Sequence, residues 1–417
     1  MYDLAIIGAG WAGFHAAQTA KKSGLKICLI EKSQIGGTCL NSGCIPTKAL
    51  IYSAKTPAIN FLKAQERKDR IIQQLRSGMQ FMLKGIDYLN TPAEILSNEE
   101  IRTKDKNIKT KSIIIATGSK PLELPELKFD GNKFISSDDI LNLKEIPSSL
   151  LIIGGGVIGC EFASLFSALG AKVSIVEKMP QLLPGEDKEI AKKLENIFRK
   201  KGIKVNTNTG AETQDFKNYG LVLIAVGRAP NTEGLGLDKL GVRLEKNKVL
   251  IDEYLKTNIH NIYAAGDVTG KIMLAHFAAY QGRIAAENIT APDLKITRCD
   301  NIPNCIFTSP EIASVGIDEE AARNKGINTK IYKFDFLGSG MARILEETEG
   351  FIKIISDKET EQVIGASIIG PRATELIGIL TLAVSEKLKI PQIRNTILAH
   401  PTLSEGITDA LRENYGI

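Results

Sequence analysis

Two stretches in the first half of the chain share one order of apolar and polar positions. Residues 3–32 form an apolar run, a glycine-rich turn, a segment with helical periodicity that closes at a glycine, and a second apolar run that ends in Glu-Lys. Residues 149–178 repeat this order with a constant offset at every landmark. The pattern predicts two copies of a strand–helix–strand unit whose strands are buried.

Further apolar runs extend each of these two units. Runs at 112–118 and 221–231 end at a glycine, and each predicts one more buried parallel strand for its own unit. A shorter run within 261–270 predicts another strand that ends in Gly-Asp. Between the units, residues 120–132 are rich in proline and charge, which is typical of a connection between domains.

The pattern changes beyond about residue 295. Strand-like runs over 350–370 precede helical patterns over 372–388 and 391–398, and this order is typical of an α+β domain. The sequence therefore predicts an α/β protein with two Rossmann-like domains and a C-terminal α+β domain.

Both repeats carry the turn motif G-x-G-x-x-G, and each ends its second strand with a glutamate. The motif glycines are Gly8, Gly10, Gly13, Gly154, Gly156 and Gly159. The first glycine allows a tight turn, the second lets the backbone approach a pyrophosphate, and the third lets helix and strand pack closely. The helix N-terminus then favours the negative charge, and Glu31 or Glu177 can accept hydrogen bonds from ribose hydroxyls. Two copies in register predict two dinucleotide-binding units; the alternative is two glycine-rich turns with solvated glutamates.

Composition narrows the class of protein. The 417 residues are 43% hydrophobic and 24% charged, and the net charge of +5 forms no basic block. Such a charge favours a solvated, lysine-rich surface over a nucleic-acid footprint. We find neither a long apolar run nor a basic N-terminal leader, so we expect a cytoplasmic protein without a membrane span.

The segment GGTCLNSGCIPTK, residues 36–48, places Cys39 and Cys44 within bridging distance. Structural disulfides are rare in the cytosol, so a close pair there favours metal binding or redox catalysis. The chain has only four histidines and no second pair of this kind, so we expect no metal site. The remaining cysteines, Cys28, Cys160, Cys299 and Cys305, read as small hydrophobic residues.

These motifs resemble the pyridine nucleotide-disulfide oxidoreductases almost from end to end. GAGWAG, the C-x4-C segment, ATG, GGGVIGCE, VGRAPN, AAGD, LAHFA, PEIASVG and AHPTLSEG occur in the family's order. The redox segment is most similar to that of the dihydrolipoyl dehydrogenases. The resemblance implies an FAD-binding domain over 1–120 completed by 251–295, a shortened NAD-binding domain over 121–250, and a dimerisation domain over 296–417.

The resemblance also implies the cofactors FAD and NAD. The first unit would bind FAD, with Asp267 on the ribityl chain and a helix that starts at 273–275 aimed at the flavin. The second would bind NAD in preference to NADP, because the Glu177 carboxylate would repel a 2′-phosphate. Further cofactor contacts implied by the resemblance are Lys32, Gly37, Thr38, Lys48, Thr117, Gly118, Met273, Leu274, Ala275, Ile158, Val205, Gly227 and Arg228.

Catalytic roles follow from the same resemblance. Cys44 would exchange electrons with the flavin, and Cys39 would form the mixed disulfide with substrate. His400, oriented by Glu405, would be the base that deprotonates the substrate thiol. Lys48 and Glu161 would form an ion pair near the flavin, although surface helix charges are the alternative.

The implied reaction is oxidation of protein-bound dihydrolipoyl groups with reduction of NAD. The partner would be the lipoyl domain of a 2-oxo acid dehydrogenase or glycine cleavage complex, and the chain would form a homodimer whose active site includes His400 of the partner subunit. Two alternatives remain: a same-fold reductase of another small disulfide or a quinone, and a flavin-bound redox-sensing or structural subunit with little turnover.

Against the family pattern, the stretch from Glu177 to Leu221 lacks room for the usual antiparallel strands, and residues 50–95 look short.

Overall fold

The computed structural model describes residues 1–56, 60–291 and 301–412. The chain divides into two compact units, which are described separately. The first unit comprises residues 1–131, 135–145 and 227–297, and the second comprises 132–134, 146–226 and 298–417. The expected three-domain division stays a prediction.

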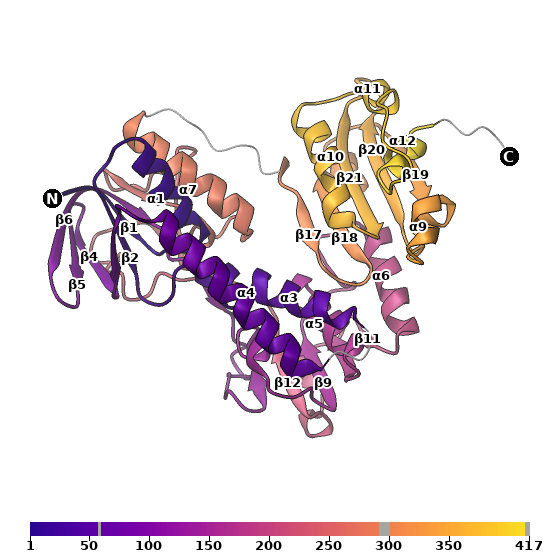
Figure 1. Ribbon diagram of the computed structural model, residues 1–417, viewed down its shortest axis with the longest axis horizontal. Helices are drawn as coiled ribbons and strands as arrows, with labels where there is room; N and C mark the ends of the chain where they lie inside the picture. Colours follow the sequence, from indigo (N-terminus) through magenta and orange to yellow (C-terminus); the bar gives the residue numbers. More distant parts are fainter. Residues whose placement is uncertain (57–59, 292–300, 413–417) are drawn as a thin grey trace. The chain divides into compact units, whose positions relative to one another are not determined.

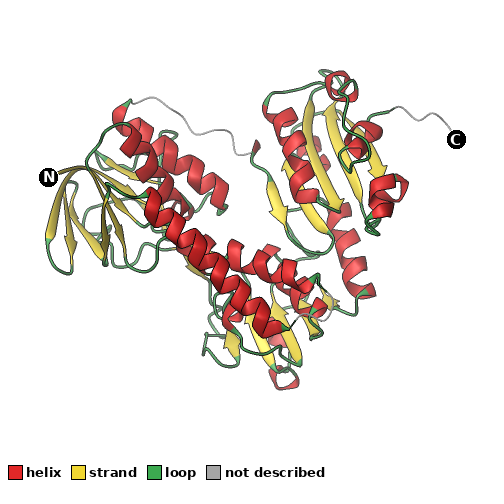
Figure 2. Cartoon of the chain, viewed as in Figure 1, coloured by secondary structure: helices red, strands yellow, loops and turns green. Residues whose placement is uncertain are grey.

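The first unit is built on a seven-stranded sheet with helices packed on it (Figures 1 and 2). The strand order is β3-β2-β1-β6-β5-β4, and β16 pairs with β6. Strands β1, β2, β6 and β16, which the sequence predicts, pair in parallel, and β3, which it does not predict, pairs in parallel with β2. The strands are β1 Tyr2–Ile7, β2 Ile27–Glu31, β3 Asp87–Asn90, β4 Ala93–Ser97, β5 Glu100–Thr103, β6 Asn107–Ile115 and β16 Ile262–Ala264.

Five α-helices lie within the described residues of the first unit. They are α1 Trp11–Lys22, α2 Gly37–Asn41, α3 Cys44–Ala54, α4 Phe61–Met82 and α7 Ala275–Thr290. Helices α1 and α7 lie side by side because their facing residues are small (Figure 1). A Cβ on Gly282 would lie only 2.0 Å from the carbonyl oxygen of Ala12, so this glycine sets the close approach. Short strands complete the unit: β7 Ser119–Pro121, β13 Arg228–Pro230, β14 Leu244–Glu245 and β15 Lys248–Val249.

The second unit begins with a five-stranded sheet in the order β11-β10-β9-β12-β8. Its elements are β8 Phe134–Ile135, β9 Ser149–Ile153, α5 Val157–Ala168, β10 Lys172–Val176, α6 Lys188–Lys200, β11 Lys204–Asn206 and β12 Leu221–Ile224. Residues 207–220, all described, form two 3₁₀ turns and no strand. Residues 178–220 thus contain no antiparallel strand, as the sequence predicts, and the shortening of the domain against the family stays a prediction.

The rest of the second unit is an antiparallel sheet covered by helices, as the α+β pattern predicts (Figure 2). Its strand order is β17-β18-β21-β20-β19. The elements are β17 Asn304–Ile306, β18 Glu311–Gly316, α8 Glu319–Asn324, β19 Thr329–Asp335, α9 Gly340–Ile344, β20 Phe351–Asp357, β21 Val363–Gly370, α10 Ala373–Ser385, α11 Ile390–Arg394 and α12 Glu405–Ala410. Among the described residues, no helix combines the length and apolar character that a membrane span requires.

A buried ion-pair cluster joins the two sheets of the second unit. Lys353 on β20 is 2% exposed, and its Nζ lies 2.8 Å from Oδ2 of Asp187, at the start of α6. Glu189 on α6, at 3.0 Å, and Glu319 on α8 also pair with this ammonium group. Burial removes water from the Lys353 charge, so the carboxylates must replace it.

Candidate active site

The first glycine-rich turn has the geometry that a pyrophosphate site needs. Gly8 has φ = 105°, and a Cβ there would lie 2.2 Å from the carbonyl oxygen of Ala116. A Cβ on Gly13 would lie 1.8 Å from the carbonyl oxygen of Gly8, so this helix and strand can pack only around a glycine. A Cβ on Gly10 would come no closer than 3.9 Å to another atom. The second glycine therefore faces free space, as the motif predicts.

The second turn repeats this geometry. Gly154 has φ = 106°, a Cβ on Gly159 would lie 2.0 Å from the carbonyl oxygen of Gly154, and a Cβ on Gly156 would meet nothing within 4 Å. Helices α1 and α5 both start directly after the second glycine, and neither start has a side-chain cap. Their first backbone N–H groups are thus available to a phosphate, so both units fit a dinucleotide.

Glu31 and Glu177 occupy equivalent positions at the ends of β2 and β10. Both are at least nine-tenths buried, and each carboxylate accepts two backbone N–H hydrogen bonds. The donors are Ala9 at 2.7 Å and Ser33 at 2.8 Å for Glu31, and Gly155 at 2.6 Å and Met179 at 2.7 Å for Glu177. The carboxylates are thereby fixed beside the glycine-rich turns. Their contact with ribose stays a prediction.

Cys39 and Cys44 lie on two successive short helices of the first unit. Cys39 is in α2, and Cys44 is the first residue of α3, where the helix N-terminus favours a thiolate. Both side chains are in the reduced, thiol form. A hydrogen bond between them and burial both raise the pKa of Cys39, so in the half-ionised pair the proton resides on Cys39.

The redox segment packs directly on the first glycine-rich turn. A Cβ on Gly37 would lie 2.8 Å from the Cα of Gly10, so α2 can meet the turn this closely only with a glycine at position 37. Trp11, the first residue of α1, and Lys48, on α3, both act on Cys39 and lower its pKa, although less than Cys44 raises it. Any nucleotide held by this turn therefore lies close to the cysteines.

A polar network of the first unit surrounds Asp267. Ser119 Oγ donates to Oδ2 of Asp267 at 2.6 Å, and Arg228 Nε donates to Ser119 Oγ at 2.8 Å. Burial raises the pKa of the Asp267 carboxyl group. Arg228 also donates to the Oγ1 of Thr38, which precedes Cys39, at 3.4 Å. Sequence reasoning missed Ser119, whose only signal was its position directly after the ATG turn.

His400 and Glu405 lie together near the C-terminus of the second unit. Nδ1 of His400 lies 2.9 Å from Oε1 of Glu405, whose Oε2 accepts the N–H of Thr402 at 2.9 Å. Both contacts lower the pKa of Glu405, the Thr402 bond more strongly. Because a carboxylate only accepts, this contact places a proton on Nδ1, and in the neutral imidazole the lone pair is then on Nε2. The imidazole is 81% exposed, so Nε2 is accessible to a proton donor outside its own unit.

Glu161 is a buried carboxylate on α5 of the second unit. It is 4% exposed, and Oε1 accepts the N–H of Phe307 at 2.9 Å. A surface location is therefore wrong for Glu161. Its ion pair with Lys48 stays a prediction.

The other expected cofactor contacts are placed as follows. Thr117 and Gly118 follow β6, and Thr117 Oγ1 donates to the carbonyl oxygen of Asn231 at 2.7 Å. Leu274 caps α7, which begins at Ala275. The remaining positions are Lys32 after β2, Ile158 in α5, Val205 in β11, Gly227 before β13 and Met273 before α7. Their contacts with a cofactor stay predictions.

Cys28 and Cys160 are buried, and burial raises the pKa of Cys28 to about 11, which fits an inert role. Cys305 is half-buried on β17, and Cys299 lies outside the described residues. Within the described ranges, no group of histidine, cysteine and acidic residues could hold a metal ion.

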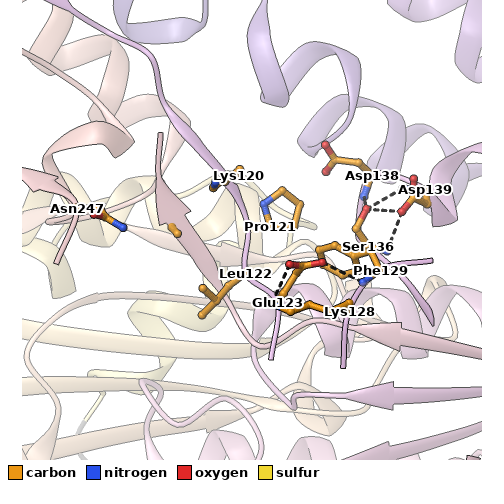
Figure 3. A pocket seen from close by; sticks show the side chains of 11 residues that line it. Lys120, Pro121, Leu122, Glu123, Lys128, Phe129, Ser136, Asp138, Asp139 and Asn247 are labelled. Atoms are coloured by element: carbon orange, nitrogen blue, oxygen red, sulfur yellow. Dashed lines mark hydrogen bonds and ion pairs between the residues drawn. The ribbon is translucent and has the colours of Figure 1, made fainter. Parts of the chain in front are cut away.

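An open groove of about 600 Å³ lies in the first unit, between the stretch 120–129 and the turn 136–139 (Figure 3). Ser136, Asp138 and Asp139 lie together on one side of it, and Leu122 and Glu123 lie on another (Figure 3). Glu123 accepts hydrogen bonds within its own stretch, from Lys128 and the N–H of Phe129. The acidic groups along the groove are thus largely satisfied by the protein itself.

Comparison with known families settles the resemblance. The pyridine nucleotide-disulphide oxidoreductase model matches residues 2–282, and the model of that family's dimerisation domain matches residues 302–411. The chain belongs to this family. The family's cofactors are FAD and NAD, and the two glycine-rich turns fit them.

Relatives of known name match over nearly their whole length. The chain is 39% identical over 453 aligned residues to a dihydrolipoyl dehydrogenase of Bacillus subtilis, with 99% of both chains covered. It is 41% identical to a dihydrolipoyl dehydrogenase of Chlamydia trachomatis, covering 97% of this chain and 95% of that one. Among solved structures, the HOCl-induced flavoprotein disulfide reductase RclA from Escherichia coli matches with a TM-score of 0.91 and 32% identity, covering 98% of this chain and 99% of that one.

Proposed function

We propose that this member of the family is a dihydrolipoyl dehydrogenase. It oxidises protein-bound dihydrolipoyl groups to lipoyl groups and reduces NAD, by way of FAD and the Cys39–Cys44 disulfide. The observation that carries the proposal is the placement of the cysteine pair: Cys44 starts α3, Cys39 shares a hydrogen bond with it, and α2 packs on the first nucleotide turn at Gly37 and Gly10. The named relatives at 39% and 41% identity support the substrate class.

The thiol steps follow from disulfide exchange. One thiol of the substrate loses its proton to Nε2 of His400, and the thiolate attacks Sγ of Cys39. The Cys39–Cys44 bond breaks, a mixed disulfide forms, and Cys44 leaves as a thiolate at the helix N-terminus. The second substrate thiol then attacks the substrate sulfur of the mixed disulfide. This step closes the lipoyl ring and leaves Cys39 reduced.

The division of roles between the cysteines matches their environments. Because the pKa of Cys39 is raised, Cys39 takes up a proton when it is released, and Cys44 retains the negative charge. When bound, FAD and NAD supply the onward transfer of the two electrons as a hydride. Glu405 keeps Nδ1 of His400 protonated and stabilises the imidazolium that forms.

The proposed assembly is a homodimer in which His400 serves the cysteine pair of the other subunit. The dimerisation-domain match and the exposure of the imidazole support this arrangement. The physiological partner would be a lipoyl domain of a 2-oxo acid dehydrogenase or glycine cleavage complex, encountered in the cytoplasm.

The test is a comparison of substrates with the purified, FAD-loaded protein. We expect NAD reduction that depends on dihydrolipoamide and is lost in Cys39→Ser and Cys44→Ser. The same preparation is assayed for NADH oxidation by oxidised glutathione and by a quinone. Turnover of one of these acceptors at a higher kcat/KM than lipoamide would instead make the chain a reductase of another substrate. If the protein turns over neither dihydrolipoamide nor oxidised glutathione nor the quinone, it is instead a flavin-bound redox-sensing or structural subunit with little turnover.

A further inference from the structure

Helix α2, which carries Cys39, is held at both ends by side chains from distant parts of the first unit. The helix has only five residues, and a helix this short is not stable by itself. At one end, Arg228 Nη2 donates to Oγ1 of Thr38 at 3.4 Å. At the other end, Ser42 Oγ donates to Oδ2 of Asp138 at 3.1 Å. The two contacts flank the redox cysteine on either side.

The two holding residues are themselves connected. Arg228 Nη1 lies 3.8 Å from Oδ1 of Asp138, with side-chain exposures of 13% and 37%. Arg228 is anchored by two further bonds to Ser119: Nε donates to Oγ at 2.8 Å and Nη2 donates to the carbonyl oxygen at 2.9 Å. Because Ser119 also donates to Asp267, the guanidinium is fixed in position and direction.

Asp138 is likewise held in advance of its contact with α2. Its N–H donates to Oγ of Ser136 at 3.2 Å, and Asp139 accepts from the N–H and the hydroxyl of Ser136 at 2.9 and 2.7 Å. Figure 3 shows this turn as a tight cluster at the edge of the groove. The Asp138 carboxylate therefore approaches Ser42 from a rigid support.

The geometry points to Arg228 and Asp138 as positioning residues that clamp α2 at Thr38 and Ser42 and so fix Cys39 against Cys44. The inference rests on the proposed redox role of the cysteine pair. Its consequence is thermodynamic. Disulfide geometry is narrow, so a clamp that holds Cys39 near Cys44 raises the effective concentration of one thiol at the other and stabilises the disulfide over the dithiol.

The experiment removes single hydroxyl groups, because such changes leave the packing intact. The FAD-loaded wild type, Ser42→Ala and Thr38→Val are equilibrated in mixtures of reduced and oxidised dithiothreitol, quenched with acid and alkylated. Mass spectrometry then counts the free thiols at 39 and 44. We expect the equilibrium constant for disulfide formation to fall about tenfold in each variant, which is about 30 mV in the potential of the pair. Ser42→Thr keeps the hydroxyl group, so we expect it to have the wild-type equilibrium constant for disulfide formation.

Two further variants separate the clamp from a general disturbance. Arg102→Gln removes an exposed ion pair with Glu94 elsewhere in the same unit, and we expect the wild-type equilibrium constant. Asp138→Ala combined with Ser42→Ala shifts the constant no further than Asp138→Ala alone, because both remove the same contact. Wild-type constants in both Ser42→Ala and Thr38→Val would overturn the clamp. This equilibrium involves neither lipoyl substrate nor NAD, so it can fail while the proposed activity stands, and the reverse also holds.

Discussion

At the scale of residues, contacts between sequence neighbours were predictable and contacts between distant residues were not. The C-x4-C spacing predicted that Cys39 and Cys44 lie close together, because both sit in one local segment, while their redox role came from the family resemblance. The His400–Glu405 contact was also predictable, since five positions separate the two residues. Ser119 and Asp138 were not, because their contacts with Arg228 and Ser42 span about a hundred residues and leave no local pattern.

A prediction at this scale concerns the base. His400→Ala should lower the rate of dihydrolipoamide oxidation by about 10²- to 10⁴-fold at neutral pH, the usual contribution of a general base. The loss should shrink as the pH rises toward the pKa of the substrate thiols, because more substrate is then already thiolate. Stopped-flow rates measured from pH 6 to 10 test both statements. A rate deficit that stays constant over this range would contradict the assigned role.

At the scale of elements, the repeated strand–turn–helix unit was predictable because its glycines are imposed by backbone sterics. The apolar pattern likewise predicted the strands over 350–370, found as β20 and β21. What the pattern could not predict is how α6 attaches to the C-terminal sheet. That attachment depends on Lys353, a buried cation within a strand that otherwise reads as apolar.

The Lys353 cluster therefore gives a stability prediction. Lys353→Ala leaves the Asp187 carboxylate buried without its partner, which should cost about 3–5 kcal/mol of unfolding free energy. Lys333→Ala is the matched control, since Lys333 also pairs with Glu189 but is 44% exposed, and its loss should cost about 0–1 kcal/mol. Urea unfolding, followed by circular dichroism, measures both. Equal effects of the two changes would mean that burial is irrelevant at this cluster.

The second glycine-rich turn gives a prediction about cofactor binding. In Gly156→Ala the new methyl group meets no protein atom within 4 Å, so the fold should be unaffected. The methyl group would instead occupy the space next to the backbone where the pyrophosphate belongs, and we expect NADH affinity to fall about tenfold. FAD content should not change, because FAD uses the other turn. Fluorescence titration with NADH measures the effect, and an unaltered Kd would show that the turn does not hold this cofactor.

At the scale of the whole molecule, the account requires two subunits for one active site. Cys44→Ala and His400→Ala should each be nearly inactive alone. In a mixed dimer, one site combines both defects and the other combines neither. Random reassortment makes about half of the dimers mixed, so about a quarter of the wild-type activity should return. The two variants are unfolded and refolded together, with refolded wild type as the reference. If the refolded wild type regains its activity and the refolded mixture shows none, His400 acts on the cysteine pair of its own subunit.

The most direct test of the central claim is a single turnover without NAD. Oxidised, FAD-loaded wild type is mixed anaerobically with one equivalent of dihydrolipoamide, quenched with acid and alkylated. The account predicts one equivalent of lipoamide, which only electron transfer to the enzyme can produce here. Cys39→Ser and Cys44→Ser, each of which lacks the disulfide that accepts the two electrons, should form no lipoamide under the same conditions. Lipoamide formation that persists in both Cys39→Ser and Cys44→Ser, or no lipoamide from the wild type, would contradict the account.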